Sequence, residues 1–305
     1  AAQDQDAPQI TSSRAFKLSG YTQILYSAAE DGIDGLSVRR SRFTLAGDLL
    51  KNVRFKATVD LVKSPVLIDA QVEFVLHEAA SLRVGQFKVP FSLEMSTSSG
   101  DLDLINRSQP INKLSPSLDI GGGDRDIGAV VFGKTAFLEY TLGLFNGAGA
   151  NKADTNDRKD LAGRIVVHPL SFLSLGASIY DGSHAVSAGA PSAVRDRIGA
   201  DLALLRGPFS FKADFLQAED GDILRRGWYV QGGYAFLPKT LQGVVRFDGY
   251  DPDGAASGDR LDTWTFGLNW FLAGKTKLQV NYETMRSESG ANRNRALLVH
   301  FQAGY

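Results

Sequence analysis

The sequence predicts an all-β protein, namely a transmembrane antiparallel β-barrel of about 16 strands. Three observations support this prediction. Apolar and polar residues alternate along most of the chain, and short turns alternate with long polar loops. The chain also has neither an apolar stripe of helical spacing nor an apolar run long enough for a membrane helix. Outer-membrane barrels combine these properties, because each of their strands shows only one apolar face to lipid.

The alternation is clearest in NVRFKATVDLV (52–62), FSFKADF (209–215), DTWTFGLNWF (262–271), KLQVNYE (277–283) and ALLVHFQAGY (296–305). Roughly 16 such segments, each about 10 to 14 residues long, fill residues 15–305, and this is a suitable length for a strand that crosses a membrane. We expect the apolar residues to face lipid and the polar residues to face the lumen.

The connections between these segments fall into two classes by length. The short turns are LLKN (49–52), GKT (133–135), RGP (206–208) and LPK (237–239), and the long loops are 27–35, 147–160, 182–196 and 251–260. Outer-membrane barrels have short periplasmic turns and long outer loops. We therefore expect Ser187 and Ser257 to lie outside the cell, and Pro238 to lie in a periplasmic turn.

Aromatic residues gather near the expected strand ends, as in the girdles at the two faces of a membrane. They are Trp228, Tyr234 and Phe236 on one segment, Trp264 and Trp270 on another, and the closing Tyr305, which we expect in the periplasmic girdle. The alternative is a soluble multi-sheet β protein. It would need two sandwiches joined by a linker, and no Pro/Gly/Ser-rich boundary marks one.

Composition excludes several classes of site. The net charge is -1, with 33 basic and 34 acidic residues, which argues against a nucleic-acid partner. There are no cysteines, and the four histidines are scattered singly. GAVVFGKT (128–135) matches a phosphate-binding loop, but an alternating strand follows it where a helix is required. The polar stretches DTND (154–157) and DPDG (251–254) suit solvated loops. We predict no cofactor, no metal and no catalytic residue.

Several stretches taken together resemble the phosphate-selective porin O and P family of Gram-negative outer membranes. They are VRRSRFTLAGDL (38–49), LIDAQVEFV (67–75), RVGQFKVPFSLE (83–94), DRDIGAVVFG (124–133) and YTLGLFNGAGANKADTNDRKDLAGRIVVHP (140–169). The resemblance implies a 16-stranded trimeric channel whose third loop folds inward to narrow the pore. The candidate for this loop is the long segment 92–123, which does not alternate.

The expected organisation is a polar N-terminal segment, 1–14, followed by a single barrel domain, 15–305, with 92–123 as its constriction loop. The polar start suggests a mature N-terminus after removal of a signal peptide. We expect outer-membrane localisation, with lipid, small anionic or neutral solutes and two further copies of the chain as partners.

Charged residues of lumen parity are the candidates for selectivity. Arg40, Arg42, Arg54 and Lys56 are expected at mid-height on neighbouring strands, with Arg107 or Lys113 added by the loop. Asp101, Asp103 and Asp119 of the loop are expected to face them and to create a transverse field. This arrangement predicts a modest anion preference, because basic arrays favour anions. In the alternative interpretation, the arginines only neutralise the loop carboxylates and anchor the loop.

The function that fits best is a passive diffusion channel for small hydrophilic solutes, which needs no nucleotide, metal or thiol. One alternative is a structural or scaffold barrel within a larger envelope complex. A second is a barrel enzyme such as a lipase or protease. The scarcity of histidine and the large expected lumen disfavour an enzyme.

Overall fold

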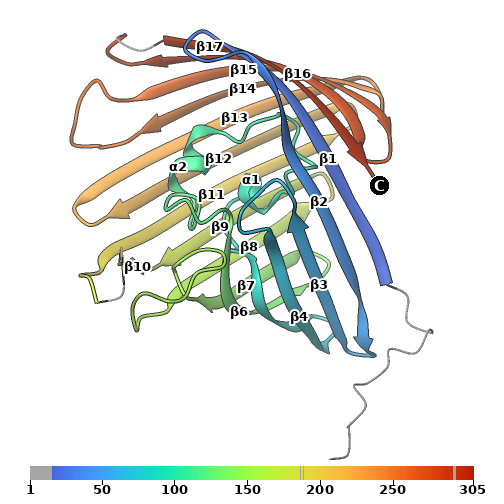
Figure 1. Ribbon diagram of the computed structural model, residues 1–305, viewed down its shortest axis with the longest axis vertical. Coiled ribbons are helices and arrows are strands. Elements are labelled where there is room, and N and C mark those ends of the chain that lie inside the picture. The colour runs from blue at the N-terminus through green and yellow to red at the C-terminus, as the bar shows by residue number, and fades with distance from the viewer. Residues whose placement is uncertain (1–15, 186, 188, 291–292) are drawn as a thin grey trace, which may run out of the picture.

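The computed structural model describes residues 16–185, 187, 189–290 and 293–305 and shows a closed barrel (Figure 1). The strands are β1 (Phe16–Ala29), β2 (Gly35–Leu50), β3 (Val53–Asp60), β4 (Leu67–His77), β5 (Ala80–Lys88), β6 (Arg125–Lys134), β7 (Leu138–Phe145), β8 (Asp160–Leu170), β9 (Leu173–Asp181), β10 (Ser183–His184), β11 (Ala193–Arg206), β12 (Phe209–Asp220), β13 (Ile223–Leu237), β14 (Leu241–Asp251), β15 (Leu261–Ala273), β16 (Thr276–Ser287) and β17 (Arg293–Gly304). The expected segment 1–14 lies outside the described residues.

Closure comes from β1, which pairs antiparallel with β2 on one side and with β17 on the other. β9 pairs directly with β11, and β10 adds only a two-residue pairing to β11. Sixteen strands therefore form the wall, as predicted. Closure leaves no strand edge within the wall, which a barrel in lipid requires because lipid offers unpaired backbone groups no hydrogen bonds.

The two ends of the barrel differ in their connections. At one end, two or three residues link successive strands, for example 207–208 and 238–240. At the other end lie the longer loops, including 146–159 and 252–260, although β12 and β13 are joined there by residues 221–222 alone. None of the helices formed by the described residues is long and apolar enough to cross a membrane.

Side chains alternate across the wall as the sequence predicts. Outward residues such as Leu142 and Ile179 are half exposed, whereas inward polar residues such as Gln279 and Thr265 are buried. Outside, Trp228, Phe247 and Trp264 form a row near the loop end of β13–β15, with ring centroids 5.3 and 4.6 Å apart. Tyr234, Phe236 and Trp270 lie near the turn end of the same sector.

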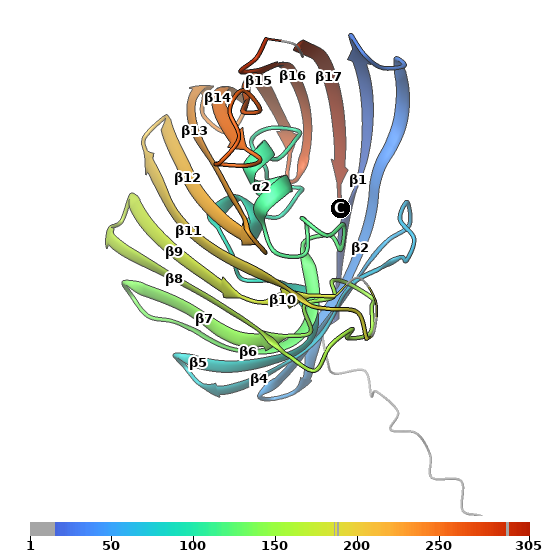
Figure 2. The same ribbon diagram turned by 90° about the vertical axis from the view of Figure 1, so that its left-hand side faces the viewer.

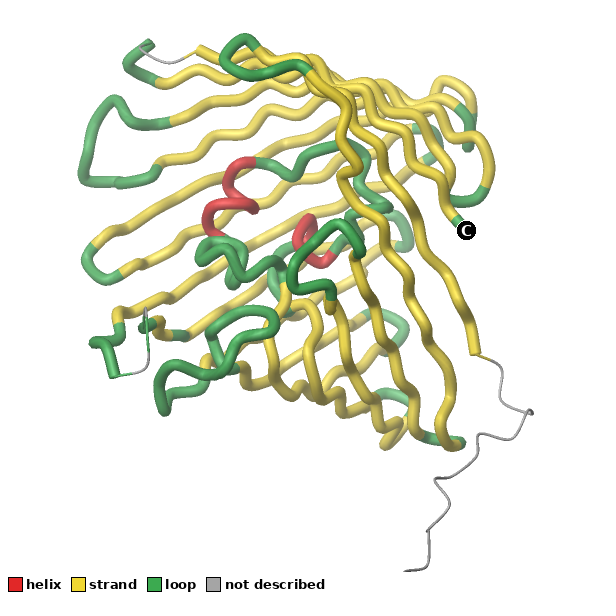
Figure 3. The backbone as a smooth tube through the Cα atoms, in the orientation of Figure 1, coloured by secondary structure: helices red, strands yellow, loops and turns green. Residues whose placement is uncertain are grey.

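The long connection between β5 and β6 (89–124) carries the only two helices among the described residues, α1 (Leu93–Ser96) and α2 (Gln109–Leu114). Both lie within the ring of strands (Figures 2 and 3). The Ser92 hydroxyl caps α1 by accepting a hydrogen bond from the Met95 amide at 3.1 Å, and Pro110 occupies the first turn of α2.

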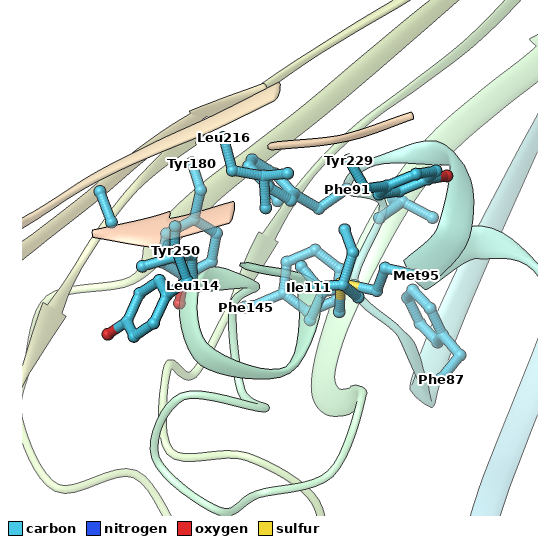
Figure 4. Close-up of a cluster of buried hydrophobic side chains, with 14 residues drawn as sticks. Phe87, Phe91, Met95, Ile111, Leu114, Phe145, Tyr180, Leu216, Tyr229 and Tyr250 are labelled. Carbon is cyan, nitrogen blue, oxygen red and sulfur yellow. The ribbon is translucent and has the colours of Figure 1, made fainter. Parts of the chain in front are cut away.

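An apolar cluster packs this segment against the inner face of the wall (Figure 4). Met95, Ile111 and Leu114 contribute from the helices, and Leu216 and Tyr229 contribute from β12 and β13. The inner face is therefore not uniformly polar, contrary to the expectation from alternation. Its apolar residues lie where the segment 89–124 covers them, so they are shielded from water.

Candidate pore constriction

Ion pairs fix one side of the segment 89–124 to β11 and β12. Asp119 accepts hydrogen bonds from Arg195 and Arg197 at 2.8 and 2.6 Å, and all three side chains are almost fully buried. Asp103 pairs with Lys212 at 2.6 Å and also accepts a hydrogen bond from Gln231 of β13. Charged, bidentate contacts of this kind are the strongest hydrogen bonds in proteins.

Further contacts continue around the wall to β17. Glu94 pairs with Arg246 of β14 at 3.1 Å, and the Lys277 ammonium of β16 donates to the Leu102 carbonyl at 2.7 Å. The Gln302 amide of β17 donates to the Gly100 carbonyl at 3.1 Å. Because inward side chains of β11 to β17 all contact this one segment, the segment is anchored along this entire side of the barrel.

These contacts correct the predicted placement of the loop carboxylates. Asp103 and Asp119 bind the wall formed by β11–β13, and Asp101 pairs with Lys275 beside β16 at 3.1 Å. The expectation that the three carboxylates face Arg40 and Arg42 is wrong. Alternation gives the direction of a side chain on a strand, but it does not show which sector of the wall an irregular segment will contact.

Open space remains on the opposite side of the segment, toward β3–β8. A cavity of about 570 Å³ lies between Ser96 and Ser98 of the segment and wall residues that include Lys56, Arg125 and Arg164. The lining is mostly polar and carries charges of both signs. The segment therefore leaves open space beside the wall of β3–β8.

Basic side chains gather at this cavity, which Lys56, Lys88 and Arg125 line, and continue from it to β2 and to the segment. Eight of them form what we call the basic cluster: Arg39, Arg40, Arg42, Lys56, Lys63, Lys88, Arg107 and Arg125. Four carboxylates lie among them: Asp60, Asp69, Asp124 and, on β16, Glu283, which accepts from the same Asn106 side chain that Arg39 contacts.

The pairs within the cluster share these carboxylates. Asp60 pairs with Arg42 at 3.0 Å. Asp69 accepts from both Lys56 and Arg125, at 2.8 and 2.9 Å. Three cations share the third carboxylate, Asp124, and they are Lys88 at 3.4 Å, Arg107 at 3.3 Å and the adjacent Arg125. The cations therefore outnumber the carboxylates that neutralise them.

Arg40 and Lys63 have no ion-pair partner among the described residues. Arg40 donates to the neutral Gln23 amide oxygen at 2.9 Å, and the positive charges of Arg39, Arg42 and Arg107 act on it. Lys63 lies in the loop 61–66. Water still reaches its side chain, but partial burial lowers the pKa of Lys63, and Arg42 and Arg40 lower it further.

A β-bulge adds Arg39 to this cluster. Gln23 of β1 is opposite Arg40, and the next residue, Ile24, is opposite Val38, so Arg39 is the extra residue of β2. Val38 points outward and is half exposed, whereas Arg39 donates to the Asn106 side chain of the segment at 2.8 Å. Bulges re-aim side chains in this way and are frequent beside functional sites. Strict alternation would place Arg39 on the lipid side.

Two other predicted residues lie elsewhere. Arg54 is the second residue of β3, beside the turn 51–52, where it pairs with Asp48 at 3.3 Å and its side chain is 59% exposed. It therefore lies at the rim and not at mid-height. Lys113 lies in the last turn of α2 and is exposed. Arg40, Arg42 and Arg107 lie near one another, and Lys56 shares Asp69 with Arg125.

Sequence reasoning missed Arg39, Lys63, Lys88 and Arg125. Only Arg125 carried a usable signal. It lies between Asp124 and Asp126 at the point where alternation resumes after the long segment. A charged triplet at that position has to lie beside the return of the segment to the wall.

Comparison with known proteins gives a family and a fold. A family model described as phosphate-selective porin O and P matches residues 21–183 and 178–303. No curated protein sequence matches the chain. The likeness to solved structures is close in shape and low in sequence identity.

A loop L8 deletion mutant of OmpT, an outer membrane protein of Vibrio cholerae, has a TM-score of 0.71 and 12% identity over 96% of this chain and 100% of that one. The outer membrane channel DcaP of Acinetobacter baumannii has a TM-score of 0.69 and 11% identity over 95% of this chain and 97% of that one. OmpF of Salmonella typhi, in complex with daunomycin, has a TM-score of 0.65 and 9% identity over 94% and 97%.

At these identities the structural likeness establishes the closed barrel alone, and the family model adds the class of protein. The chain is an outer-membrane diffusion channel, and it belongs to the phosphate-selective porin O and P family.

Proposed function

We propose that this channel prefers small anions and acts by passive diffusion, without catalysis. The observation that carries the proposal is the excess of the eight cations of the basic cluster over the four carboxylates beside them, Asp60, Asp69, Asp124 and Glu283, with three of these cations lining the open cavity. Basic arrays favour anions at a narrow point. Screening does not remove the effect, because the Debye length is about 8 Å at physiological salt and a solute passing here lies closer than that.

The closed side of the lumen does not oppose this preference. Its carboxylates, among them Asp103 and Asp119, are engaged by Lys212, Arg195 and Arg197 behind the segment 89–124. A solute in the cavity on the open side meets Lys56, Lys88 and Arg125 of the basic cluster. The alternative in which Arg40 and Arg42 neutralise the loop carboxylates is disfavoured, because other cations bind those carboxylates.

Reversal potentials in a salt gradient test the proposal. The informative variant is Arg40→Gln combined with Lys63→Gln, because neither cation is paired with a carboxylate among the described residues and their removal leaves no buried carboxylate alone. The wild type should be anion-selective, and the double variant should move toward equal permeability. Lys51→Gln is the matched control, since it removes an exposed charge from the turn 51–52, outside the lumen, and should change nothing. Cation preference in the wild type, or the same selectivity in the double variant, would refute the proposal.

The trimeric state is also a proposal. OmpT of Vibrio cholerae has been described in a trimer form, and a closed symmetric ring is the usual state of such oligomers. We expect three copies in mild detergent by light scattering, and a monomer would contradict this. Conductance in a pure lipid bilayer separates a channel from a scaffold barrel, because a scaffold that a partner must open would conduct nothing alone.

A further inference from the structure

The outer wall of β13–β16 carries an apolar groove that the channel function does not use. One part has a volume of about 720 Å³ and is lined by residues that include Gly232, Tyr234, Phe236, Phe266 and Tyr282. A second hollow of about 330 Å³ adjoins it, since Leu268 and Val280 line both. The two together extend toward the turn 238–240, whose Thr240 lines the second hollow.

A missing side chain creates the floor of the groove. Gly232 lies on the outward face of β13 between Val230 and Tyr234, which are 38% and 40% exposed. A side-chain carbon placed at Gly232 would meet no atom within 4 Å. Gly232 pairs with Val245 of β14, and Val245 pairs in turn with Phe266 of β15. The outer surface of the wall is therefore recessed at Gly232, whereas the side chains around it project into the membrane.

We propose that this groove binds one acyl chain of a phospholipid whose phosphate lies beside Lys239. The groove runs in the half of the wall nearest the short turns, which is the half that faces the periplasmic leaflet. Lys239 is exposed in the turn 238–240, next to Thr240 at the end of the second hollow. The site thus has an apolar channel at the depth of the lipid tails and a cation at the depth of the headgroups.

Contact on several sides explains why a lipid acyl chain would stay in this groove while the other lipids around the barrel exchange. Elsewhere a lipid tail touches the ridges of the wall on one side only. Here the rings of Tyr234, Phe266 and Tyr282 flank it as well. Each atomic contact is weak, but dispersion attraction adds up over a whole chain. The Lys239 charge adds selectivity for anionic headgroups, because a basic side chain near such lipids contributes about 1 kcal/mol.

Native mass spectrometry of the purified channel can count the retained phospholipid. The wild type should hold one phospholipid per chain after washing in mild detergent. Gly232→Leu should lose it, because leucine fills the floor and the backbone at Gly232 has no left-handed strain. Val245→Phe fills the same floor from β14 and serves as a second variant. Ala177→Leu is the control, since it adds nearly as much bulk to the outward face of β9, far from the groove.

Lys239→Asn tests the headgroup contact, since asparagine tolerates the positive φ of 62° found at this residue. In this variant the preference for phosphatidylglycerol over phosphatidylethanolamine should fall about fivefold, while the acyl chain of the lipid stays in the groove. Several results would overturn the proposal. They are a wild type without retained lipid, equal retention by Gly232→Leu and Ala177→Leu, and a change in the number of subunits in Gly232→Leu. The last would show that a second copy of the chain fills the groove.

Discussion

Gly20 and Tyr305 exchange two backbone hydrogen bonds, of 2.8 and 3.1 Å, where the first strand of the barrel meets the last. The Tyr305 ring lies over Gly20 and 5.3 Å from the ring of Phe43, and its hydroxyl donates to the Arg42 carbonyl at 3.2 Å. A side-chain carbon at Gly20 would lie 2.1 Å from the Arg42 carbonyl oxygen and 2.6 Å from the tyrosine ring, so glycine is required there. The closing residue of the chain is thus joined to both β1 and β2.

Deletion of Tyr305 should therefore destabilise the closed barrel. Two backbone hydrogen bonds are lost, each worth about 1 kcal/mol, together with the ring contacts. The fraction of heat-resistant folded protein on a gel, and the urea midpoint, should both fall. Tyr305→Phe is the control, because it keeps the backbone and the ring and removes only the 3.2 Å bond to Arg42. Equal folding of the deletion variant and the wild type would show that closure does not depend on this residue.

Deletion of Arg39 should reduce anion selectivity without unfolding the barrel. Because Arg39 is the extra residue of a bulge, its removal leaves Val38 outward and Arg40 inward, and the register on both sides is preserved. One cation is lost from the basic cluster, along with the bond to Asn106. Reversal potential gives the selectivity, and heat resistance on a gel gives the fold. Deletion of Thr44, which pairs regularly with both β1 and β3 and lies farther from the bulge, is the contrasting variant, and it should disrupt the register and the fold.

Replacement of Asp119 by Asn should loosen the segment 89–124. It leaves Arg195 and Arg197 without their shared buried carboxylate, and breaking a buried pair in this way costs about 3–5 kcal/mol. We expect larger fluctuations of single-channel current and faster proteolysis within the segment. Asp157→Asn removes an exposed carboxylate in the loop 146–159 and should match the wild type. A quiet channel in Asp119→Asn would mean that the apolar cluster alone holds the segment.

Cysteine labelling in intact cells should establish the orientation of the barrel. Ser187 and Ser257 lie in loops at one end, and Pro238 lies in the turn 238–240 at the other. Ser187→Cys and Ser257→Cys should react with a membrane-impermeant reagent, whereas Pro238→Cys should react only after lysis. The chain has no other cysteine to interfere. The reverse pattern would invert the topology and place the groove of β13–β16 in the outer leaflet.

The wall could be predicted from the sequence because its physical rule is simple. Alternation with period two fixes which face of a strand meets lipid, so Arg40, Arg42 and Lys56 point inward as expected. Alternation does not give the height of a residue along its strand. The turn 51–52 comes directly before β3, so Arg54 lies at the rim of the barrel and not at mid-height.

Two features were beyond the reach of pattern analysis. The bulge at Arg39 depends on the pairing of β1 with β2, and no local property of β2 reveals it. The partners of Asp103 and Asp119 depend on how an irregular segment crosses the lumen, which is decided by packing of Met95, Ile111 and Leu114 against the far wall. Such contacts join residues that are distant in sequence, so spacing carries no information about them.

The apolar cluster beneath α2 gives this membrane protein two kinds of thermal behaviour. The outward face of the wall rests in lipid, where apolar side chains gain nothing by leaving water. Met95, Ile111 and Leu114 are different, since they are buried away from a water-filled lumen. Their packing therefore depends on a hydrophobic driving force that weakens on cooling. Near freezing, the segment 89–124 should loosen while the barrel around it stays closed. The single-channel current should then fluctuate more in the cold, although the barrel remains folded.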